Sequence, residues 1–261
     1  MNDHFALITP VVLTFNEAPN IARTLEPLEV FPKVIVVDSG STDETLEIAR
    51  GFANVSILKR PFDDHCSQWN FGLDACDTPW VLSLDADYVL EPELVSEITK
   101  LDLGTQTHRA YAVRFRYCIN GHALRATLYP SRIVLFQRAR ARYAQDGHTQ
   151  ILQCSSAVAM LDGRIRHDDR KRLDRWLVNQ TKYACQEADK LTSSSKGELG
   201  LRDRIRLIPG LAPCLAFCYC YFVRGLVFDG RPGLYYSLQR AYAELLLSLV
   251  LLEREFERSS N

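Results

Sequence analysis

Residues 36–45 read VVDSGSTDET, and this stretch predicts the basic unit of the fold. The apolar run over residues 33–37 predicts a strand, and Ser41 with Glu44 forms a capping-box pattern that marks the start of a helix. A strand that leads directly into a helix is typical of parallel α/β sheets. The turn between the two carries Asp38, at the position where open sheets bind their ligands.

The same alternation continues on both sides of this unit. Apolar runs and helical spacing predict strands at 6–15, 55–58, 80–84, 110–117 and 133–136, and helices at 67–75, from Pro92 onward, and at 173–191. We therefore expect an α/β fold with a parallel sheet in the N-terminal part of the chain.

The composition is that of an ordinary folded protein. The chain has 261 residues, of which 47% are hydrophobic and 24% charged, with 31 Lys and Arg against 32 Asp and Glu. The net charge of -1 argues against nucleic acid as a partner, and we expect none. The eight cysteines form no CxxC pair and the N-terminus shows no secretory signal, so we expect reduced thiols and a cytosolic location.

The near-neutral total conceals a basic middle. Residues 131–175 contain ten Lys and Arg against five Asp and Glu. These arginines have two interpretations. They form a solvated face, or Arg132, Arg138 and Arg140 attract an anionic diphosphate or another phosphorylated ligand.

An apolar segment distinguishes the C-terminal part of the chain. Residues 207–223 carry no charge but include Pro209 and Pro213, so the segment is poorly suited to span a membrane as one helix. Arginines on both sides of this segment would suit the anionic headgroups of a lipid leaflet. They are Arg202, Arg204, Arg206 and Arg224. We expect attachment to a membrane surface, with a buried helix pair, a dimer interface or a true span as alternatives. A serine cluster at 192–195 separates the two expected domains, 1–192 and 193–261; the oligomeric state stays open.

Acidic or polar motifs follow three of the predicted strands. They are Thr14-Phe15-Asn16-Glu17, the turn beginning at Asp38, and Asp85-Ala86-Asp87. Because parallel strands end at the same edge of a sheet, we expect these motifs to lie together. Asp-x-Asp presents two carboxylates to one small volume, where Mg²⁺ or Mn²⁺ can bridge the protein to a diphosphate. Asp38 is placed to accept hydrogen bonds from a ribose or a base.

With these motifs the chain resembles family 2 glycosyltransferases of the GT-A fold. VVDSGSTDET, the Asn16-Glu17 pair and SLDADYVLEPEL carry the resemblance, which is closest to the bacterial subgroup that extends lipopolysaccharide-core or other envelope glycans. Residues 67–72, 163–167 and 228–234 add to it. The resemblance implies a Rossmann-like mixed sheet with a C-terminal helical extension. It also implies transfer of a sugar from a nucleotide-sugar donor to an envelope glycan or lipid-linked saccharide acceptor, inverting and metal-assisted.

Individual site residues are assigned by the same resemblance. The donor pocket would be formed by Thr14, Asn16, Glu17, Asp38, Ser67, Asn70, Asp85 and Ala86. Asp87 would hold Mg²⁺ or Mn²⁺ with His148 as a second ligand, and His167 is a further candidate for contact with metal or phosphate. The subgroup usually has a His-Glu pair where this chain has Gln145-Asp146-Gly147-His148-Thr149. Asp146 is therefore the candidate general base.

Two other functions compete with glycosyl transfer. A sugar nucleotidyltransferase would need a glycine-rich, basic segment after the first strand, where this chain has Asn16 and Glu17. A non-catalytic nucleotide-sugar-binding scaffold at the membrane is suggested by Thr149, which replaces an expected acid. For the leading hypothesis we expect a cytoplasmic enzyme, peripheral on the cytoplasmic face of the inner membrane.

Overall fold

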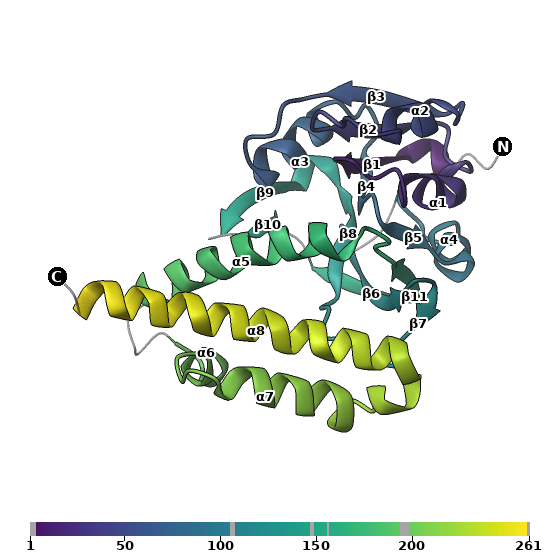
Figure 1. Ribbon diagram of the computed structural model, residues 1–261. Helices are drawn as coiled ribbons and strands as arrows, with labels where there is room; N and C mark the ends of the chain where they lie inside the picture. The colour runs from purple at the N-terminus through teal and green to yellow at the C-terminus, as the bar shows by residue number, and fades with distance from the viewer. Residues whose placement is uncertain (1–3, 105–107, 147–148, 156, 194–198, 260–261) are drawn as a thin grey trace. The chain divides into compact units, whose positions relative to one another are not determined.

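The computed structural model describes residues 4–104, 108–146, 149–155, 157–193 and 199–259. The chain forms two compact units (Figure 1). The first comprises Met1–Gly121 with Leu128–Arg170, and the second comprises His122–Thr127 with Lys171–Asn261. The division into domains 1–192 and 193–261 stays a prediction; the long helix before residue 193 packs against helices of the second unit.

A mixed sheet is the centre of the first unit. Its strands run in the order β3-β2-β1-β4-β8-β6-β11-β5. Their bounds are β1 (Ile8–Thr14), β2 (Val34–Asp38), β3 (Val55–Lys59), β4 (Trp80–Asp85), β5 (Tyr88–Leu90), β6 (Ala110–Ile119), β8 (Arg132–Gln137) and β11 (Val158–His167). The first four strands of this order are parallel, whereas β8 is antiparallel to β4 and β6. The α/β sheet and its parallel N-terminal part are therefore confirmed.

Helices cover both faces of this sheet. They are α1 (Ile21–Leu25), α2 (Thr45–Arg50), α3 (His65–Asp74) and α4 (Pro92–Ile98), with short 3₁₀ turns η1 (Phe5–Leu7), η2 (Glu26–Leu28) and η3 (Arg138–Arg140). Apolar residues of α1, α2 and α4 join one core cluster, and those of α3 join the other. At Gly72 of α3, a Cβ would lie 2.6 Å from Cγ1 of Val11, so only glycine allows α3 to approach β1 this closely.

The predicted capping box of α2 is wrong. Glu44 precedes the helix but makes no capping bond with its side chain, and Ser41 Oγ instead accepts a hydrogen bond from the Asn16 amide at 2.8 Å. Oδ1 of Asp43, the residue before the N-cap, accepts a hydrogen bond from the Thr45 amide at 3.1 Å and so satisfies the first N–H of the helix. The helix predicted at 67–75 begins two residues earlier, where Asp64 accepts a hydrogen bond from the Ser67 amide.

A short hairpin completes the first unit. Strands β9 (Ala141–Asp146) and β10 (Thr149–Cys154) pair with each other in a separate two-stranded sheet. The hairpin packs beside α3, as Figure 1 shows.

The second unit is mainly helical. It contains β7 (His122–Ala123), α5 (Leu173–Ser193), α6 (Leu201–Arg206), α7 (Leu211–Cys218), the π-turn η4 (Tyr219–Val223), η5 (Leu226–Asp229) and α8 (Gly230–Ser259). Helix α8 packs against both α5 and α7 (Figure 1). Arg206 joins three helices, with its guanidinium 2.9 Å from Glu187 of α5 and 2.5 Å from Glu244 of α8.

Within the described ranges, none of the helices taken singly has the length and hydropathy needed to cross a membrane. One helix pair meets these criteria jointly, Leu211–Val223 with Leu226–Ser259, and it is bent by 71°. Of the predicted serine linker at 192–195, Thr192 and Ser193 belong to the end of α5, and residues 194 and 195 lie outside the described residues.

Candidate active site

The strand register brings the three predicted motifs to one edge of the sheet. Thr14 of β1 is opposite Asp38 of β2, and Leu13 is opposite Asp85 of β4. All three strands are parallel, so the loops that follow them emerge side by side. This edge, at the C-terminal ends of β1, β2 and β4, is called the ligand edge below.

The first two loops at the ligand edge are joined by Asn16. Its backbone has a positive φ of 53°, and its side-chain Oδ1 accepts hydrogen bonds from the amides of Thr42 at 2.7 Å and Asp43 at 3.3 Å. The amide of Glu17 donates a hydrogen bond to Thr45 Oγ1 at 2.7 Å. The buried carboxylate of Glu17 accepts a hydrogen bond from the side-chain amide of Asn20. These bonds hold the loops in a fixed relation before any ligand arrives.

Asp38 organises the turn after β2. Its carboxylate is fully buried and accepts hydrogen bonds from the amides of Gly40 at 3.0 Å and Ser41 at 3.1 Å. Beside it, Oγ1 of Thr14 is buried without a hydrogen-bond partner in the described part of the chain. The ends of β1 and β2 thus hold one unsatisfied buried hydroxyl and one carboxylate that accepts backbone bonds, and their expected roles toward a nucleoside stay predictions.

The acidic motif after β4 meets a histidine. Asp85 is half-buried, Asp87 is buried, and Oδ2 of Asp87 lies 3.1 Å from Nε2 of His167 at the end of β11. The carbonyl of Ala86 accepts a bond from Thr24 Oγ1 at 2.7 Å, which anchors the motif to α1. Burial lowers the pKa of His167, but Asp87 and Asp85 raise it more, so the net shift is upward.

The Asp87–His167 pair has donor atoms that suit a divalent cation. Asp87 and His167 offer one carboxylate and one imidazole, and Nδ1 of His167 is buried without a partner among the described residues. The part of the chain that the structure describes holds no group of three or more His, Cys, Asp or Glu side chains suited to a metal. Mg²⁺ and Mn²⁺ commonly take only one or two protein ligands and complete their coordination with substrate phosphate. The residues present fit a cation that is shared with a diphosphate.

Three aromatic rings surround His167. The ring centroids of Tyr129, Tyr117 and Tyr88 lie 4.6, 4.8 and 5.3 Å from that of the imidazole. The hydroxyls of Tyr88 and Tyr129 bond to each other, and the Arg132 guanidinium lies 5.2 Å from the Tyr129 ring. No role was predicted for these tyrosines. Their signal in the sequence is weak, because they lie on β5, on β6 and in the loop before β8, three segments that only the fold brings together.

Ser67 and Asn70, both predicted to contact the donor, bond to protein groups in the structure. The amide and Oγ of Ser67 both donate to Asp64, at 2.8 and 2.7 Å, at the start of α3. The side-chain amide of Asn70 bonds the backbone of Tyr143 in β9. Their expected roles toward the donor stay predictions. The backbone of β9 ends at Asp146, and His148 lies outside the described residues.

The arginines of the basic middle do not form one cluster. Arg132 begins β8, and continuation of the β4–β8 register places it opposite Asp85 at the ligand edge. The Arg138 amide instead donates to the carbonyl of Pro79, at the opposite end of β4 about 17 Å away. The interpretation that Arg138 and Arg140 attract the donor diphosphate is therefore wrong.

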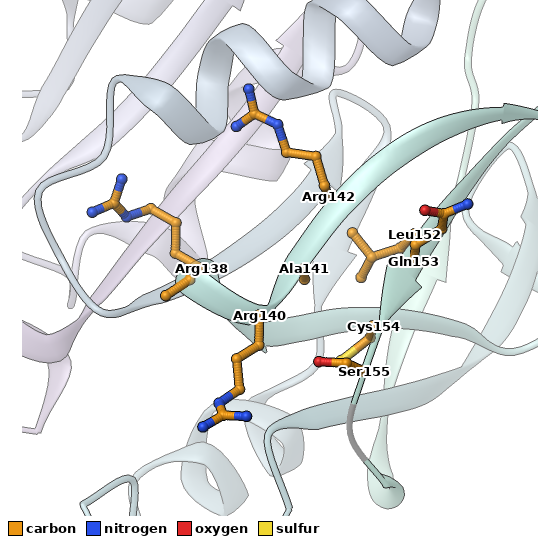
Figure 2. A pocket seen from close by; sticks show the side chains of 9 residues that line it. Arg138, Arg140, Ala141, Arg142, Leu152, Gln153, Cys154 and Ser155 are labelled. Carbon is orange, nitrogen blue, oxygen red and sulfur yellow. The ribbon is translucent and has the colours of Figure 1, made fainter.

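A shallow hollow surrounds these other arginines (Figure 2). It is lined by Arg138–Arg142 and Leu152–Ser155, and the guanidinium groups of Arg138, Arg140 and Arg142 point in different directions. Arg142 is paired with Asp74 at 2.5 and 2.8 Å.

A parallel sheet that continues into antiparallel strands, with an Asp-x-Asp motif at the end of β4, is the architecture of the GT-A fold. Residues 9–161 match the profile of Glycosyl transferase family 2, and the chain belongs to this family. It is thus a glycosyltransferase, and the predicted enzyme class is confirmed.

Individual relatives extend the likeness over the whole chain. The lipopolysaccharide core biosynthesis glycosyltransferase LpsC of Rhizobium meliloti (strain 1021) is 24% identical over 261 residues, which cover 95% of this chain and 92% of that protein. An uncharacterised glycosyltransferase of Rickettsia prowazekii (strain Madrid E) is 24% identical over 92% of this chain and 84% of its own. The mannosyltransferase PcManGT from Pyrobaculum calidifontis, solved with GDP-Man and Mn²⁺, has a TM-score of 0.55 at 17% identity and covers 94% of this chain and 87% of its own. The last comparison bears on the fold, and it confirms the GT-A expectation.

Proposed function

We propose that this glycosyltransferase moves a sugar from a nucleotide-sugar donor to a lipopolysaccharide-core or other lipid-linked saccharide, with inversion at the anomeric carbon. The observation that carries the proposal is the Asp87–His167 pair at the C-terminal end of β4, where a donor diphosphate would be held. Similarity to LpsC along almost the entire chain supports the choice of acceptor class.

Asp87 and His167 would hold Mg²⁺ or Mn²⁺, with Asp85 beside the donor ribose or sugar. The cation would supply positive charge to the diphosphate as it departs. The loops of Thr14, Asn16, Glu17 and Asp38 would bind the nucleoside.

Asp146 would act as the general base. Its carboxylate would take the proton of the acceptor hydroxyl while the hydroxyl oxygen bonds to the anomeric carbon. The bond from that carbon to the diphosphate oxygen breaks, and the nucleoside diphosphate leaves with the electron pair. The backbone of Tyr143 in β9 bonds to Asn70 of α3, and its hydroxyl bonds to Ser83 of β4. Strand β9 is therefore attached to both elements before it ends at Asp146.

The first test is a thermal-shift screen of UDP- and GDP-sugars with Mn²⁺, Mg²⁺ or EDTA, because a bound donor raises the melting temperature by mass action. We expect a shift that needs the cation and is lost in Asp87→Asn. Release of nucleoside diphosphate should then depend on an added lipopolysaccharide-core acceptor. If no nucleotide sugar shifts the melting temperature under any condition, the proposed donor class is wrong.

We also propose that the second unit attaches the enzyme to the cytoplasmic face of a membrane. The exposed side chains of α7 and η4 are uncharged and, apart from the hydroxyl of Tyr219, apolar or thiols, with exposed fractions of 46% for Leu215, 60% for Phe222 and 72% for Val223. Arg224 follows directly, and Arg202 and Arg204 precede the segment, as suits anionic headgroups.

Flotation of the full chain with anionic liposomes tests this attachment. The double variant Leu215→Glu/Phe222→Glu should stay at the bottom of the gradient, because both changes place charge on the apolar face. Val178→Glu serves as the control, since Val178 is more exposed than either residue, at 70%, but lies on α5. Equal flotation of all three proteins would refute the assignment of this face.

A further inference from the structure

The β9–β10 hairpin needs its own means of attachment to the catalytic sheet. Its two strands pair only with each other in the described structure and share no ladder with the main sheet. Tyr143, in the middle of β9, lies opposite Leu152 of β10. Side chains must therefore determine where β9 lies, and with it the position of its last residue, Asp146.

Asn70 of α3 provides this attachment in the manner of a neighbouring strand. The amide N–H of Tyr143 donates to Oδ1 of Asn70 at 3.1 Å, and Nδ2 of Asn70 donates to the carbonyl of Tyr143 at 3.0 Å. One side chain thus satisfies both backbone groups of a strand edge that would otherwise be unpaired. The thiol of Cys66, one turn earlier on α3, donates to the same carbonyl.

The side chain of Tyr143 makes the second half of the attachment. Its ring stacks on Trp69 with centroids 5.2 Å apart and an interplanar angle of 19°. Its hydroxyl donates to Oγ of Ser83 at 3.0 Å, and Ser83 lies on β4 two residues before Asp85. Burial raises the pKa of Tyr143, so this hydroxyl stays protonated and remains a donor across the neutral range.

Helix α3 is itself held firmly on the sheet. Trp69 and Leu73 are buried in the core cluster that includes Val11 and Phe136, and Gly72 lets the helix approach β1 without a gap. A latch made by Asn70, Tyr143 and Ser83 therefore connects β9 to a rigid support on one side and to the strand of the Asp-x-Asp motif on the other.

We propose that Asn70 and Tyr143 are positioning residues, which place the end of β9 against the acidic motif of β4 and so govern turnover rather than donor binding. The functional half of this inference rests on the proposed role of Asp146. It also gives Asn70 a different role from the donor contact that the family resemblance implies. A displacement of about 1 Å at a reacting group can cost on the order of 100-fold in rate, so a loosened latch should be visible in kcat.

The test uses the full chain with Asn70→Ala and Tyr143→Phe. Asn54→Ala is the matched control, because the Asn54 amide also bonds backbone, donating to the carbonyls of Leu28 and Phe31 at 2.9 Å, but it lies before β3 and away from the hairpin. Three quantities are measured: amide hydrogen exchange over residues 141–146, the Kd for UDP and GDP with Mn²⁺, and kcat for nucleoside diphosphate release from the matching nucleotide sugar.

For Asn70→Ala we expect faster exchange in β9, a kcat lower by about 10- to 100-fold, and a nucleotide Kd within about twofold of wild type. Tyr143→Phe retains the stacked ring, so its exchange and kcat should change in the same direction but by less. The control should change none of the three, although its melting temperature falls. Rescue of exchange and kcat in Asn70→Gln relative to Asn70→Ala would further support the latch.

Several results would overturn the inference. Unchanged exchange in β9 would mean that Asn70 does not hold the strand. Faster exchange with unchanged kcat would show that Asn70 does not act as a positioning residue. If the nucleotide Kd of Asn70→Ala rose by the same factor as kcat fell, Asn70 would instead contact the donor. Failure of the Asp146 assignment is distinguishable, because a fully active Asp146→Asn variant would leave the exchange result untouched.

Discussion

Nε2 of His167 lies 3.1 Å from Oδ2 of Asp87, although 80 residues separate the two in the chain. The contact arises because β11 pairs with β5, so that His167 is opposite Tyr88, the residue after Asp87. The loop after β4 and the end of β11, a strand parallel to β6, thus each contribute one side chain to the proposed cation site.

Substitution of either residue should remove the cation dependence of nucleotide binding. We expect His167→Ala and Asp87→Asn to weaken UDP or GDP binding with Mn²⁺ by at least about tenfold, equivalent to about 1.4 kcal/mol. Isothermal titration measures this directly. Binding in EDTA should be the same for both variants and wild type, and His122→Ala, at an exposed histidine, should bind normally. An unchanged affinity with Mn²⁺ would argue against this pair as the cation site.

Loss of the general base should slow transfer without affecting donor binding. Asp146→Asn keeps the size of the side chain but cannot take the acceptor proton, so kcat should fall by about 10²- to 10⁴-fold. The nucleotide Kd should stay within about twofold of wild type. Asp162→Asn is the control, since the side chain of Asp162 is 97% exposed. Full activity in Asp146→Asn would require another base.

Gly72→Ala should destabilise the first unit. The added methyl would lie 2.6 Å from Cγ1 of Val11, both in a packed core, so either α3 or β1 must shift. Overpacking of this kind costs about 1–3 kcal/mol of unfolding free energy. Urea denaturation measures the loss. Gly104→Ala should be close to neutral, because its Cβ would meet only Asp102 at 3.6 Å; equal stabilities for the two variants would contradict the close packing of α3.

The cap of α3 should make part of the stability depend on pH. Hydrogen bonds from Ser67 lower the pKa of Asp64, so the folded state favours the ionised carboxylate. Its stabilisation is complete above the unfolded pKa of about 3.9 and is lost as the pH falls through the lower folded pKa. Asp64→Ala should therefore cost about 1 kcal/mol at pH 7 and little at pH 2. A cost that stayed constant between these pH values, measured by urea denaturation, would show that the charge is not responsible.

The sheet was predictable because its strands are marked by local composition. The apolar runs before Asn16, at 33–37 and before Asp85 each form a strand within a few residues of the predicted bounds. Parallel pairing then requires their polar ends to share an edge, which is why the three motifs lie together.

The contacts of individual side chains were less predictable, because they depend on strands that arrive much later in the sequence. Asn70 was predicted to line the donor pocket from its place in the sequence motif. In the structure both hydrogen-bonding groups of its side chain bond to the backbone of Tyr143 in β9, 73 residues further on. Similarly, Arg132 and Arg138 belong to one basic segment, yet they occupy opposite ends of β8 and therefore opposite edges of the sheet. Charge counted along the sequence does not reveal this separation.

The late position of β11 has a consequence for how the protein folds. Strands β1 to β4 and helices α1 to α4 lie within the first 98 residues and can assemble from contacts that are near in sequence, whereas β11 can pair with β5 and β6 only after β8, β9 and β10 have been synthesised. Ribosome-bound chains truncated before residue 158 would therefore hold the nucleoside loops without the histidine. Binding of Mn²⁺ by Asp87 and His167 would then show that synthesis has passed β11 and that β11 has paired with β5.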